Sequence, residues 1–309
     1  MKILVTCPPM LGRIDTFRPL FEAKNVELVA PKVVQTLSEE ELMGLLPDMD
    51  GWIIGDDPAT ERVFTAGRQG KLRAAVKWGV GVDNVNFEAC KKLGIPVTNT
   101  PGMFGEEVAD MAIGYLIGLA REMFLVDRGV RSGQWLKPPG MSLSGTTAAL
   151  IGFGDIGRAV GVRLEALGMK ALVYDPHAAI PENMAHCTRT TFPEGIETAD
   201  FVMVTCSLTP ETRHLINRNS ISLMKDGVRI INVSRGPIID ETALVEALIS
   251  GKVHSAGLDV FEQEPLPADS PLRNFERCIF GTHNGSNTVQ AVHRTSIKAI
   301  QLLFDFLGI

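Results

Sequence analysis

Short apolar runs alternate with helical patterns in the first part of the chain. Runs rich in apolar and β-branched residues predict strands, and apolar residues spaced three or four positions apart predict helices. Strands that alternate with helices indicate βαβ units and a parallel sheet. The expected strands are Lys2–Thr6, Val26–Ala30, Gly51–Gly55, Ala75–Trp78 and Pro96–Asn99, and the expected helices are Ser38–Leu46, Glu61–Gln69 and Phe87–Leu93.

A longer amphipathic pattern follows, from Glu106 to Arg131, with one broad apolar face. A helix of this length exceeds the usual length in globular proteins, so we expect it to bridge two domains. The segment Gln134–Met141 is rich in proline and glycine and is predicted to be a loop.

A second alternating series begins at Thr146. Its six predicted strands are Thr147–Ile151, Lys170–Asp175, Phe201–Thr205, Arg229–Val233, Ala256–Val260 and Cys278–Gly281. Because a helix from about Thr288 to Leu307 comes after this sheet is complete, we expect it to return to the first domain. The prediction is an α/β protein of two Rossmann-like, doubly wound domains with parallel sheets, in which domain 100–285 is inserted into domain 1–99 plus 286–309.

Composition narrows the classes of function. Of 309 residues, 45% are apolar and 21% charged, the balance of a globular protein, and no apolar run is long enough to span a membrane. A net charge of −6 argues against a nucleic-acid partner. The five scattered cysteines form no CxxC pair, and the first residues are typical of a strand rather than a signal peptide, so we expect reduced thiols in a cytoplasmic protein without a metal site.

A dinucleotide-binding motif stands at the start of the second series. Gly152, Gly154 and Gly157 form G-x-G-x-x-G after an apolar strand and before an apolar helix, which is the context that the motif requires. The glycines allow a tight turn, close approach of a pyrophosphate and close packing of helix on strand, and the helix N-terminus supplies N–H donors. A purely structural glycine-rich turn is the simpler alternative.

Asp175 ends the next predicted strand, 18 residues beyond Gly157. A carboxylate at this place can accept hydrogen bonds from the adenosine ribose and would repel a 2′-phosphate. The following Pro176-His177 offers no arginine for such a phosphate. The pattern therefore favours NAD over NADP, although Asp175 could also be a solvated strand end.

Three polar features follow later strands, at the sheet edge where α/β proteins bind ligands. Arg235 lies in Asn232-Val-Ser-Arg-Gly236, and an arginine can hold a carboxylate with two N–H groups. Carboxylates occur at Asp259, Glu262 and Glu264, and His283 follows the last strand. Histidine suits the removal of an alcohol proton during hydride transfer, because its ordinary pKa is about 6.5.

The chain resembles the D-isomer-specific 2-hydroxyacid dehydrogenases. The segments that carry the resemblance occur in order along almost the whole chain, and Val80-Gly-Val-Asp-Asn84 and Tyr174-Asp-Pro176 look most like phosphoglycerate dehydrogenases and their relatives. These segments are Lys77-Trp-Gly-Val-Gly-Val-Asp-Asn84, Asn99-Thr-Pro101, the glycine motif, Leu208-Thr-Pro-Glu-Thr-Arg-His-Leu-Ile-Asn217, Asn232-Val-Ser-Arg-Gly236, Leu258-Asp-Val-Phe-Glu-Gln-Glu-Pro265 and His283.

The resemblance implies roles for individual residues in an NAD-dependent enzyme that moves a hydride to or from C2 of a small D-2-hydroxy acid. Arg235 would bind the substrate, His283 would be the acid–base catalyst and Glu264 its partner. The implied domains are a substrate domain (1–99 plus 286–309) and an NAD-binding domain (100–285). The substrate loop would contain Trp78, Gly79, Val80 and Gly81, and the cofactor site Gly152, Gly154, Asp155, Ile156, Gly157, Asp175, Cys206 and Asp259.

Each catalytic residue also has a simpler interpretation: His283 as a strand-end histidine, Arg235 in a surface ion pair and Glu264 as one solvated acid of a loop. Their joint occurrence behind a cofactor motif favours the catalytic one. The other five histidines receive no role.

The chain departs from its relatives in ways that bear on the substrate. Thr282 precedes His283 where many relatives have proline, and the segment after it differs at the pocket rim. Asp56-Asp57 stands where phosphoglycerate dehydrogenases present a basic residue, and two carboxylates would repel a phosphate unless Arg62, Arg73 or Lys77 compensates. Because the chain ends at Ile309, we expect no C-terminal regulatory domain.

Several alternatives remain open. The same scaffold could reduce glyoxylate or hydroxypyruvate, or oxidise formate or phosphite. A different class is an NAD(H)-sensing binding protein of the corepressor type, and a third is a degenerate, cofactor-binding structural protein. By analogy with relatives we expect a homodimer.

Overall fold

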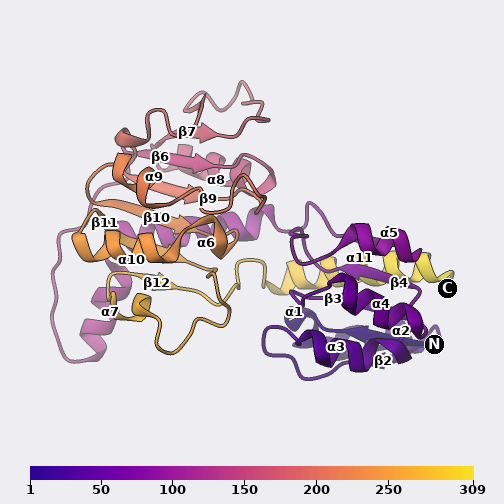
Figure 1. Ribbon diagram of the computed structural model, residues 1–309. Coiled ribbons are helices and arrows are strands. Elements are labelled where there is room, and N and C mark those ends of the chain that lie inside the picture. Colours follow the sequence, from indigo (N-terminus) through magenta and orange to yellow (C-terminus); the bar gives the residue numbers. More distant parts are fainter. The chain divides into compact units, whose positions relative to one another are not determined.

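The computed structural model describes residues 1–309 and divides into two compact units. The smaller unit contains Met1–Met103 and Asn287–Ile309, and the larger contains Phe104–Ser286. Each unit is a parallel sheet covered by helices on both faces (Figure 1). The predicted fold class of two doubly wound α/β domains is confirmed.

The sheet of the smaller unit has five parallel strands in the order β2-β1-β3-β4-β5. Its strands are rich in isoleucine, leucine, valine and tryptophan. Strands β3 and β4 are buried along their whole length because helices cover both faces of the sheet. The strands are β1 Lys2–Val5, β2 Glu27–Val29, β3 Gly51–Ile54, β4 Ala74–Lys77 and β5 Val97–Asn99.

Helices α3, α4 and α5 share one hydrophobic cluster with β1, β3 and β4, and α11 packs on β3 and β4. Sequence patterns missed α1 and α2, because prolines and Gly12 interrupt their periodicity. At the end of the chain, a Cβ on Gly51 would lie 3.1–3.3 Å from Leu303 and Leu307, so α11 packs closely on β3. The helices are α1 Pro8–Leu11, α2 Ile14–Glu22, α3 Glu39–Leu45, α4 Glu61–Gln69, α5 Phe87–Leu93 and α11 Val289–Leu307.

The larger unit has seven parallel strands in the order β12-β11-β10-β9-β6-β7-β8. The strand order reverses between β6 and β9, which is where sheets of this type bind ligands. The sequence predicted six of these strands and missed β8, a polar edge strand without an apolar run. The strands are β6 Thr147–Ile151, β7 Lys170–Tyr174, β8 Cys187–Thr190, β9 Phe201–Val204, β10 Val228–Asn232, β11 Val253–Leu258 and β12 Ile279–Phe280.

The predicted single helix Glu106–Arg131 is wrong. The structure has two helices, α6 (Gly105–Ala120) and α7 (Met123–Arg131), and both belong to the larger unit. They meet at Glu122, whose φ of 53° is left-handed and ends α6. The buried Glu122 carboxylate lies 3.3 Å from Nε2 of His254 and 3.8 Å from Nε of Arg277. Tertiary pairing of this carboxylate therefore interrupts a pattern that local periodicity would continue.

The remaining helices of the larger unit are α8 Asp155–Ala166, α9 Arg218–Leu223 and α10 Glu241–Ser250. Helix α8 packs on α6, and α9 packs on α10. Figure 1 shows α6 and α8 behind the sheet and α9 and α10 in front of it. The sheet therefore lies between two layers of helices. The predicted site residues lie at the ends of its strands and at the start of α8.

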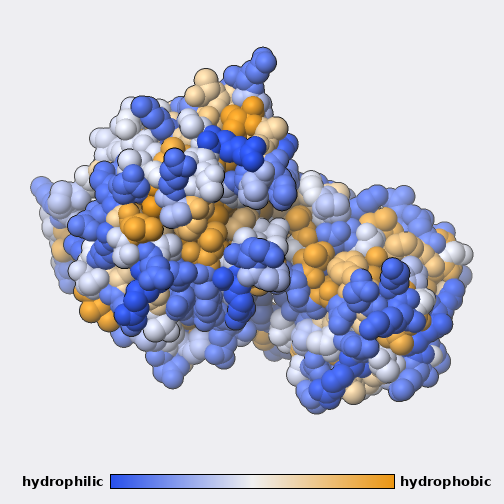
Figure 2. All heavy atoms as spheres, turned by 45° about the horizontal axis from the view of Figure 1, so that its top comes forward, coloured by the Kyte–Doolittle hydropathy of each residue, from blue (hydrophilic) through white to orange (hydrophobic).

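The face drawn in Figure 2 is mainly hydrophilic, with smaller apolar areas interspersed. The five cysteines are free thiols, and only Cys206 is not buried. None of the helices has both the length and the apolar composition needed to cross a bilayer.

We expect His254 to make the larger unit less stable as the pH falls from about 6.5 to about 4. Burial, with the charges of Arg229 and Arg277, lowers the pKa of His254 from 6.5 to about 4. The unfolded chain therefore binds a proton in this window that the folded chain does not, which lowers the free energy of unfolding by up to about 3 kcal/mol as the pH falls.

Urea unfolding of the protein and of His254→Gln at pH 7 and pH 4.5 measures this effect. The variant should lose less stability between the two pH values than the native protein. Equal losses would show that His254 does not cause the dependence.

Candidate active site

The glycine loop between β6 and α8 is shaped by close backbone contacts. Gly152 has a φ of +94°, and a Cβ there would lie 2.6 Å from the backbone of Cys206. A Cβ on Gly157 would lie 2.3 Å from the carbonyl oxygen of Gly152. By contrast, a Cβ on Gly154 would have no neighbour within 4 Å. The loop is therefore packed beneath Gly152 and Gly157 and open above Gly154.

That open space lies at the N-terminus of α8. Gly154 is the N-cap residue of α8, and Asp155 and Ile156 are its first two helical residues. No side chain hydrogen-bonds to the N–H groups at this end of the helix. Uncapped N–H groups and the positive end of the helix dipole suit a pyrophosphate. The loop thus fits a dinucleotide, with a cradle that a side chain at position 154 would fill.

Asp175, directly after β7, closes the same loop. Its Oδ2 accepts the N–H of Phe153 at 2.8 Å and its Oδ1 accepts the N–H of His177 at 2.8 Å. Each carboxylate oxygen can accept a second hydrogen bond, so these contacts leave acceptor capacity for ribose hydroxyls. The sequence did not reveal that Asp175 also holds the glycine loop in shape.

The sequence also missed a cation beside Asp175. Arg189 on β8 donates to the carbonyl oxygen of Pro176 and, at 3.2 Å, to that of Ala178. An arginine therefore contacts residues 176–178, although the sequence has no arginine directly after Asp175. The negative charge of Asp175 becomes the main feature of this segment that would disfavour a 2′-phosphate.

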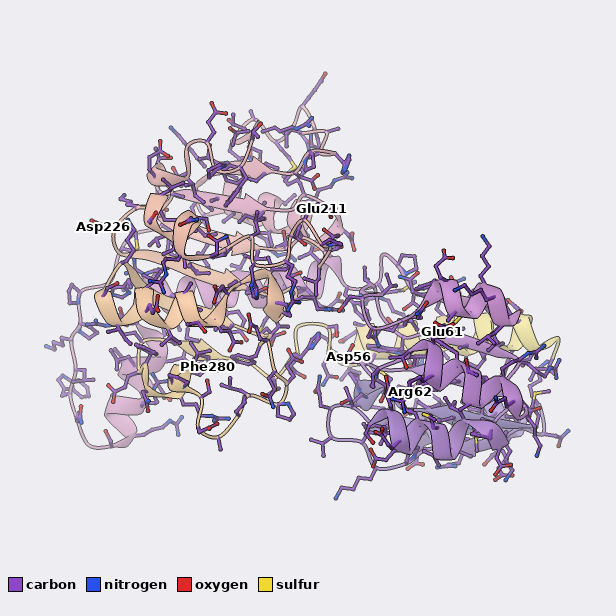
Figure 3. The ribbon with its side chains drawn as sticks, in the orientation of Figure 1. Asp56, Glu61, Arg62, Glu211, Asp226 and Phe280 are labelled. Carbon is purple, nitrogen blue, oxygen red and sulfur yellow. The ribbon has the colours of Figure 1, made fainter.

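We expect Asp175→Asn to weaken NADH binding and to improve NADPH binding relative to NADH by about tenfold. Asparagine keeps one oxygen acceptor, so one of the two loop N–H bonds is lost together with the charge. That lost bond weakens the binding of both cofactors, whereas a loss of about 1.4 kcal/mol of repulsion toward the 2′-phosphate shifts their ratio about tenfold. Fluorescence titration with both cofactors measures the ratio. Asp226→Asn, on an exposed carboxylate (Figure 3), is the control. A native preference for NADPH would contradict the assignment of Asp175.

Hydrogen bonds between strand ends hold the backbone around Arg235. Asn232, at the end of β10, accepts the Ser234 N–H at 3.0 Å and donates to the Arg235 carbonyl oxygen at 2.9 Å. The Ser234 hydroxyl donates to the carbonyl oxygen of Cys206, after β9. Arg235 Nη1 donates to the Ser234 carbonyl oxygen at 2.9 Å. These bonds place the guanidinium and Cys206 on neighbouring strand ends.

His283 and Glu264 lie in direct contact. His283 Nδ1 is 2.8 Å from Glu264 Oε2, and both side chains are about one-fifth exposed. The other oxygen of Glu264 accepts the Phe261 N–H at 3.0 Å. Because a carboxylate only accepts, Nδ1 carries the proton of this bond, and proton exchange with another molecule falls to Nε2.

Asp259 holds the segment that carries His283. The carboxylate is 2% exposed and accepts the N–H of Asn284 at 3.1 Å and that of Gly285 at 2.8 Å. Its backbone oxygen accepts the His283 N–H at 2.6 Å. Tyr115 donates its hydroxyl to Asp259 at 3.3 Å, and burial and the charge of Asp259 raise the pKa of that hydroxyl. Asp259 is therefore an anchor of the His283 segment, whatever contact it makes with a cofactor.

The predicted substrate loop, Trp78–Gly81, follows β4 in the smaller unit. The Trp78 N–H donates to Ile54 and the Gly79 N–H donates to Oγ1 of Thr100, at 2.8 Å. Trp78 also donates its indole N–H to Ser296 of α11 at 3.1 Å. The loop backbone is therefore fixed at Trp78 and Gly79 by the surrounding fold.

Asp56 and Asp57 do not form an exposed acidic pair. Lys77, which is 2% exposed, donates to Asp56 at 2.8 Å and to the Gly55 carbonyl oxygen at 2.6 Å. Asp57 is fully buried and accepts the N–H groups of Leu37 and Gly55 and the hydroxyl of Thr6. Burial raises the pKa of Asp57, against the lowering effect of these bonds. Of the two acids, only Asp56 lies near the surface (Figure 3).

Comparison with known proteins connects this geometry to a family. The sequence model of the D-isomer specific 2-hydroxyacid dehydrogenase, NAD binding domain, matches residues 113–285. The chain is 39% identical to the hydroxypyruvate reductase of Thermotoga maritima, over 88% of this chain and 90% of that protein. The chain belongs to the D-isomer specific 2-hydroxyacid dehydrogenase family.

Other members of the family differ in length and substrate. The D-3-phosphoglycerate dehydrogenase of Methanocaldococcus jannaschii is 36% identical over 94% of this chain, which spans 54% of that protein. The D-lactate dehydrogenase of Aquifex aeolicus, whose structure holds NAD and lactic acid, is 25% identical, with a TM-score of 0.85 over 100% of this chain and 96% of that chain.

Membership confirms two predictions: this dehydrogenase acts on CH–OH groups, and its cofactor is NAD. The chain offers no group of three or more histidine, cysteine or acidic side chains arranged to hold a metal ion.

Sequence patterns indicated no role for His214, but in the structure its imidazole is paired with a carboxylate. Its Nε2 lies 2.7 Å from Oε1 of Glu262, in the turn that carries Glu264. The Glu262 N–H donates to Glu241 at 2.6 Å. The only available signal was the spacing of three acids in residues 259–264, which does not indicate a partner on another loop.

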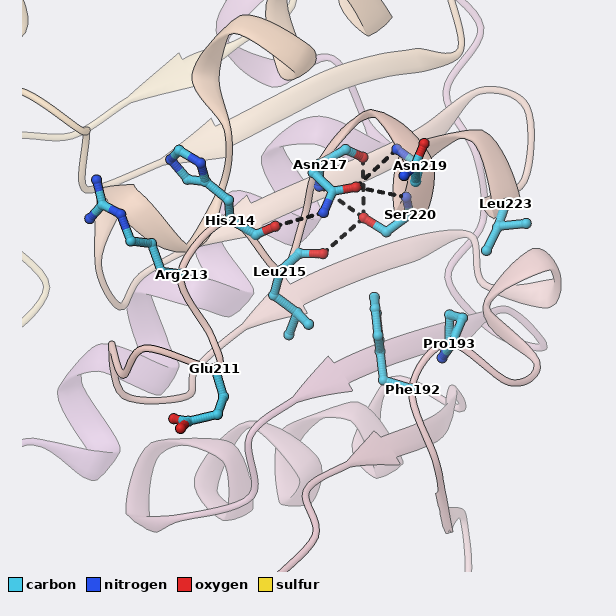
Figure 4. Close-up of a pocket in the computed structure, with 10 residues that line it drawn as sticks. All are labelled: Phe192, Pro193, Glu211, Arg213, His214, Leu215, Asn217, Asn219, Ser220 and Leu223. Carbon is cyan, nitrogen blue, oxygen red and sulfur yellow. Dashed lines mark hydrogen bonds between the residues drawn. The ribbon is translucent and has the colours of Figure 1, made fainter.

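A cavity of about 400 Å³ lies beside His214 in the larger unit (Figure 4). Phe192, Pro193, Leu215 and Leu223 form its apolar part, and hydrogen bonds among Asn217, Asn219 and Ser220 occupy another side. None of the predicted site residues lines it. The cavity therefore adds nothing to the dehydrogenase site as predicted. Its residues are Phe192, Pro193, Glu211, Arg213, His214, Leu215, Asn217, Asn219, Ser220 and Leu223.

Proposed function

We propose that this enzyme interconverts a small D-2-hydroxy acid and its 2-oxo acid with His283 as the general acid–base catalyst. The main support is the 2.8 Å hydrogen bond between His283 Nδ1 and the Glu264 carboxylate. The Phe261 N–H holds the other oxygen of that carboxylate. This bond selects the tautomer and orientation of the ring. A histidine whose Nδ1 is hydrogen-bonded to a carboxylate is suited to accepting and returning a proton at Nε2.

In the oxidation direction, Nε2 takes the proton of the C2 hydroxyl. The resulting imidazolium carries a positive charge next to Glu264, and that carboxylate stabilises it. In the reduction direction, the imidazolium returns the proton to the C2 carbonyl oxygen as hydride addition to C2 turns that oxygen into an alkoxide. His283 and Glu264 thus supply the proton transfer in both directions.

We assign the substrate carboxylate and the C2 oxygen to Arg235. Its guanidinium can donate two parallel N–H bonds and stays charged at every physiological pH. The anchored backbone from Asn232 to Arg235 limits the movement of this side chain. A fixed positive charge at the C2 oxygen favours the negative charge that develops there.

The cofactor assignments follow from the open cradle above Gly154. We propose that the N–H groups at the start of α8, including those of Asp155 and Ile156, hold the pyrophosphate, with Cys206 and Gly152 forming the wall. Asp175 would accept the ribose hydroxyls. NAD would supply the hydride acceptor, and Asp259 would contact the nicotinamide end of the cofactor.

In the smaller unit, which we propose as the substrate domain, the N–H groups of Val80 and Gly81 would hold the substrate. Those of Trp78 and Gly79 already donate within the fold. The larger unit would be the NAD-binding domain. The sequence boundaries of 99/100 and 285/286 for these functional domains stay our proposal.

We favour an unphosphorylated substrate. The three cations that might hold a phosphate are engaged elsewhere: Lys77 with Asp56, Arg62 with Glu39 at 2.9 Å, and Arg73 with the Leu307 carbonyl oxygen at 3.3 Å. Recruiting any of them would break an existing bond. Hydroxypyruvate and glyoxylate therefore fit better than a phosphorylated acid such as that of phosphoglycerate dehydrogenases.

The test is NADH consumption with hydroxypyruvate, glyoxylate, pyruvate, 2-oxoglutarate and 3-phosphohydroxypyruvate. We expect turnover with unphosphorylated acids and a much lower kcat/KM with the phosphorylated one. A preference for 3-phosphohydroxypyruvate would overturn the substrate proposal but keep the reaction. NADH binding without turnover of any acid would favour an NAD(H)-sensing binding protein.

We further propose a homodimer through α7 and the segment after it. Met123, Phe124, Val130 and Trp135 are all large, apolar and exposed, with Trp135 79% exposed. Such a concentration is unusual on a monomer surface and is typical of an interface. We also propose a reducing compartment such as the cytoplasm, because all five cysteines are free.

We expect Trp135→Glu combined with Phe124→Glu to yield a monomer in sedimentation velocity, because two charges would be buried in the interface. The native protein should sediment as a dimer. Val34→Glu, at a position of the smaller unit that is also 79% exposed, is the control and should leave the dimer intact. A native monomer would contradict the proposal.

A further inference from the structure

A second network of charged side chains adjoins the turn that carries Glu264. Glu262 Oε1 accepts a hydrogen bond from His214 Nε2 at 2.7 Å and, at 3.5 Å, from the Glu241 N–H. In return, the Glu262 N–H donates to Glu241 Oε1 at 2.6 Å. Glu262 is thus bonded through both its side chain and its backbone, to two segments distant in the sequence.

The network reaches Glu264 through a short piece of backbone. Phe261, adjacent to Glu262, donates the N–H that holds Glu264 Oε1 at 3.0 Å. A Cβ on Gly236 would lie 1.9 Å from the Phe261 carbonyl group, so this backbone also rests on the segment after Arg235. A shift of Glu262 would move the Phe261 N–H and rotate the carboxylate that orients His283.

His214 itself is held in a costly conformation. Its φ is 51°, in the left-handed region that few residues other than glycine adopt. Its N–H donates to the Pro237 carbonyl oxygen at 2.8 Å and its carbonyl oxygen accepts from Asn217 at 2.8 Å. Backbone bonds on both sides therefore aim the imidazole at Glu262 despite the strain.

We propose that His214 and Glu241 are positioning residues that act through Glu262 on the Glu264–His283 pair. This inference rests on the proposed role of His283. Neither residue contacts the reacting atoms in this scheme. They hold the Phe261–Glu264 turn, and so the angle at which Glu264 meets His283 Nδ1, in the geometry that proton transfer needs.

The test compares variants that remove the contacts with variants that keep them. His214→Ala removes the donor, whereas His214→Gln places an amide N–H near the position of Nε2. Glu241→Ala removes the acceptor, whereas Glu241→Gln keeps an oxygen. His186→Ala and Glu246→Ala are the controls, on another histidine beside a carboxylate and on the same helix as Glu241.

We expect the two positioning alanine variants to lower kcat about five- to tenfold, the effect of about 1 kcal/mol from partly exposed charged contacts. The KM for NADH should stay within twofold of native. The glutamine variants should recover most of kcat, and the control variants should keep it. Loss of kcat and NADH binding together, without rescue by glutamine, would show a general structural defect and overturn the proposal.

The pH dependence of kcat/KM separates a positioning role from a purely structural one, because a general loss of structure would not shift it. A histidine holds its proton less tightly when a neighbouring carboxylate moves away from it. Because reduction requires its protonated form, kcat/KM in the alanine variants should fall off at a lower pH than in the native enzyme. The groups that bear on this titration include Glu264, bonded to His283; Asp259, bonded to the His283 backbone and to Tyr115; and Glu241 and Glu262, whose charges lie near one another and near Glu264.

The two proposals fail differently. If His283→Asn keeps native turnover, the proposed function is wrong. If His283→Asn is inactive while His214→Ala and Glu241→Ala keep native kcat and an unchanged pH profile, the function stands and the positioning network is refuted.

Discussion

Replacement of His283 by asparagine is expected to lower kcat by about 10²- to 10⁴-fold, the range for losing a general acid–base catalyst. The asparagine amide can still donate to Glu264 Oε2 from near the position of Nδ1, so the Glu264 carboxylate keeps its partner. It has no ionisable nitrogen at the position of Nε2. The proton of the C2 hydroxyl would then have to pass to water.

The fold and cofactor binding should survive this change. The glycine loop and Asp175 belong to β6, α8 and the end of β7, whereas His283 follows β12. NADH titration and thermal unfolding should therefore match the native protein. His293→Asn, at an exposed position of α11, is the matched control. Native turnover in His283→Asn would remove the histidine from the mechanism.

Arg235→Gln is expected to lower kcat/KM by about 10²- to 10³-fold, the cost of removing one donor to a developing oxyanion. Glutamine keeps part of the length and one N–H donor but loses the charge and the second parallel bond. The backbone at this position is held by Asn232, so the turn should keep its shape. Steady-state kinetics with the preferred 2-oxo acid measures the loss.

A lysine at the same position separates charge from geometry. Arg235→Lys keeps the charge but not the two-pronged donor, and should recover only part of the activity. Arg213→Gln, on an exposed arginine beside the cavity of Figure 4, should behave as native. Full activity in Arg235→Gln would mean that another group binds the substrate carboxylate.

Sequence patterns predicted most strands because these are continuous apolar runs between turns. They failed where tertiary contacts compete with local pattern. Glu122 breaks the amphipathic stretch 106–131 because its carboxylate is drawn inward to His254 and Arg277. The strand β8 was missed because an edge strand needs no apolar run.

The candidate site shows the same division. Spacing and order indicated Arg235, Glu264 and His283, because each follows a strand of one parallel sheet and such ends meet at one edge. The sequence also suggested that Asp56 and Asp57 would repel a phosphate. The structure instead pairs Asp56 with Lys77 and buries Asp57 among three donors, a compensation between segments far apart in the chain.

By itself, the sequence determined the family, the two-domain α/β architecture, the cofactor and the candidate catalytic residues, because these depend on local motifs and their order. Only the tertiary structure showed the contacts that no motif indicated: Asp259 with the segment after it, and His214 with Glu262. For the expected pair of Glu264 and His283, it supplied the atoms in contact and their distance. A hydrogen bond depends on the position of two atoms within a few tenths of an ångström. That position is set by packing across the whole sheet, which no local pattern encodes.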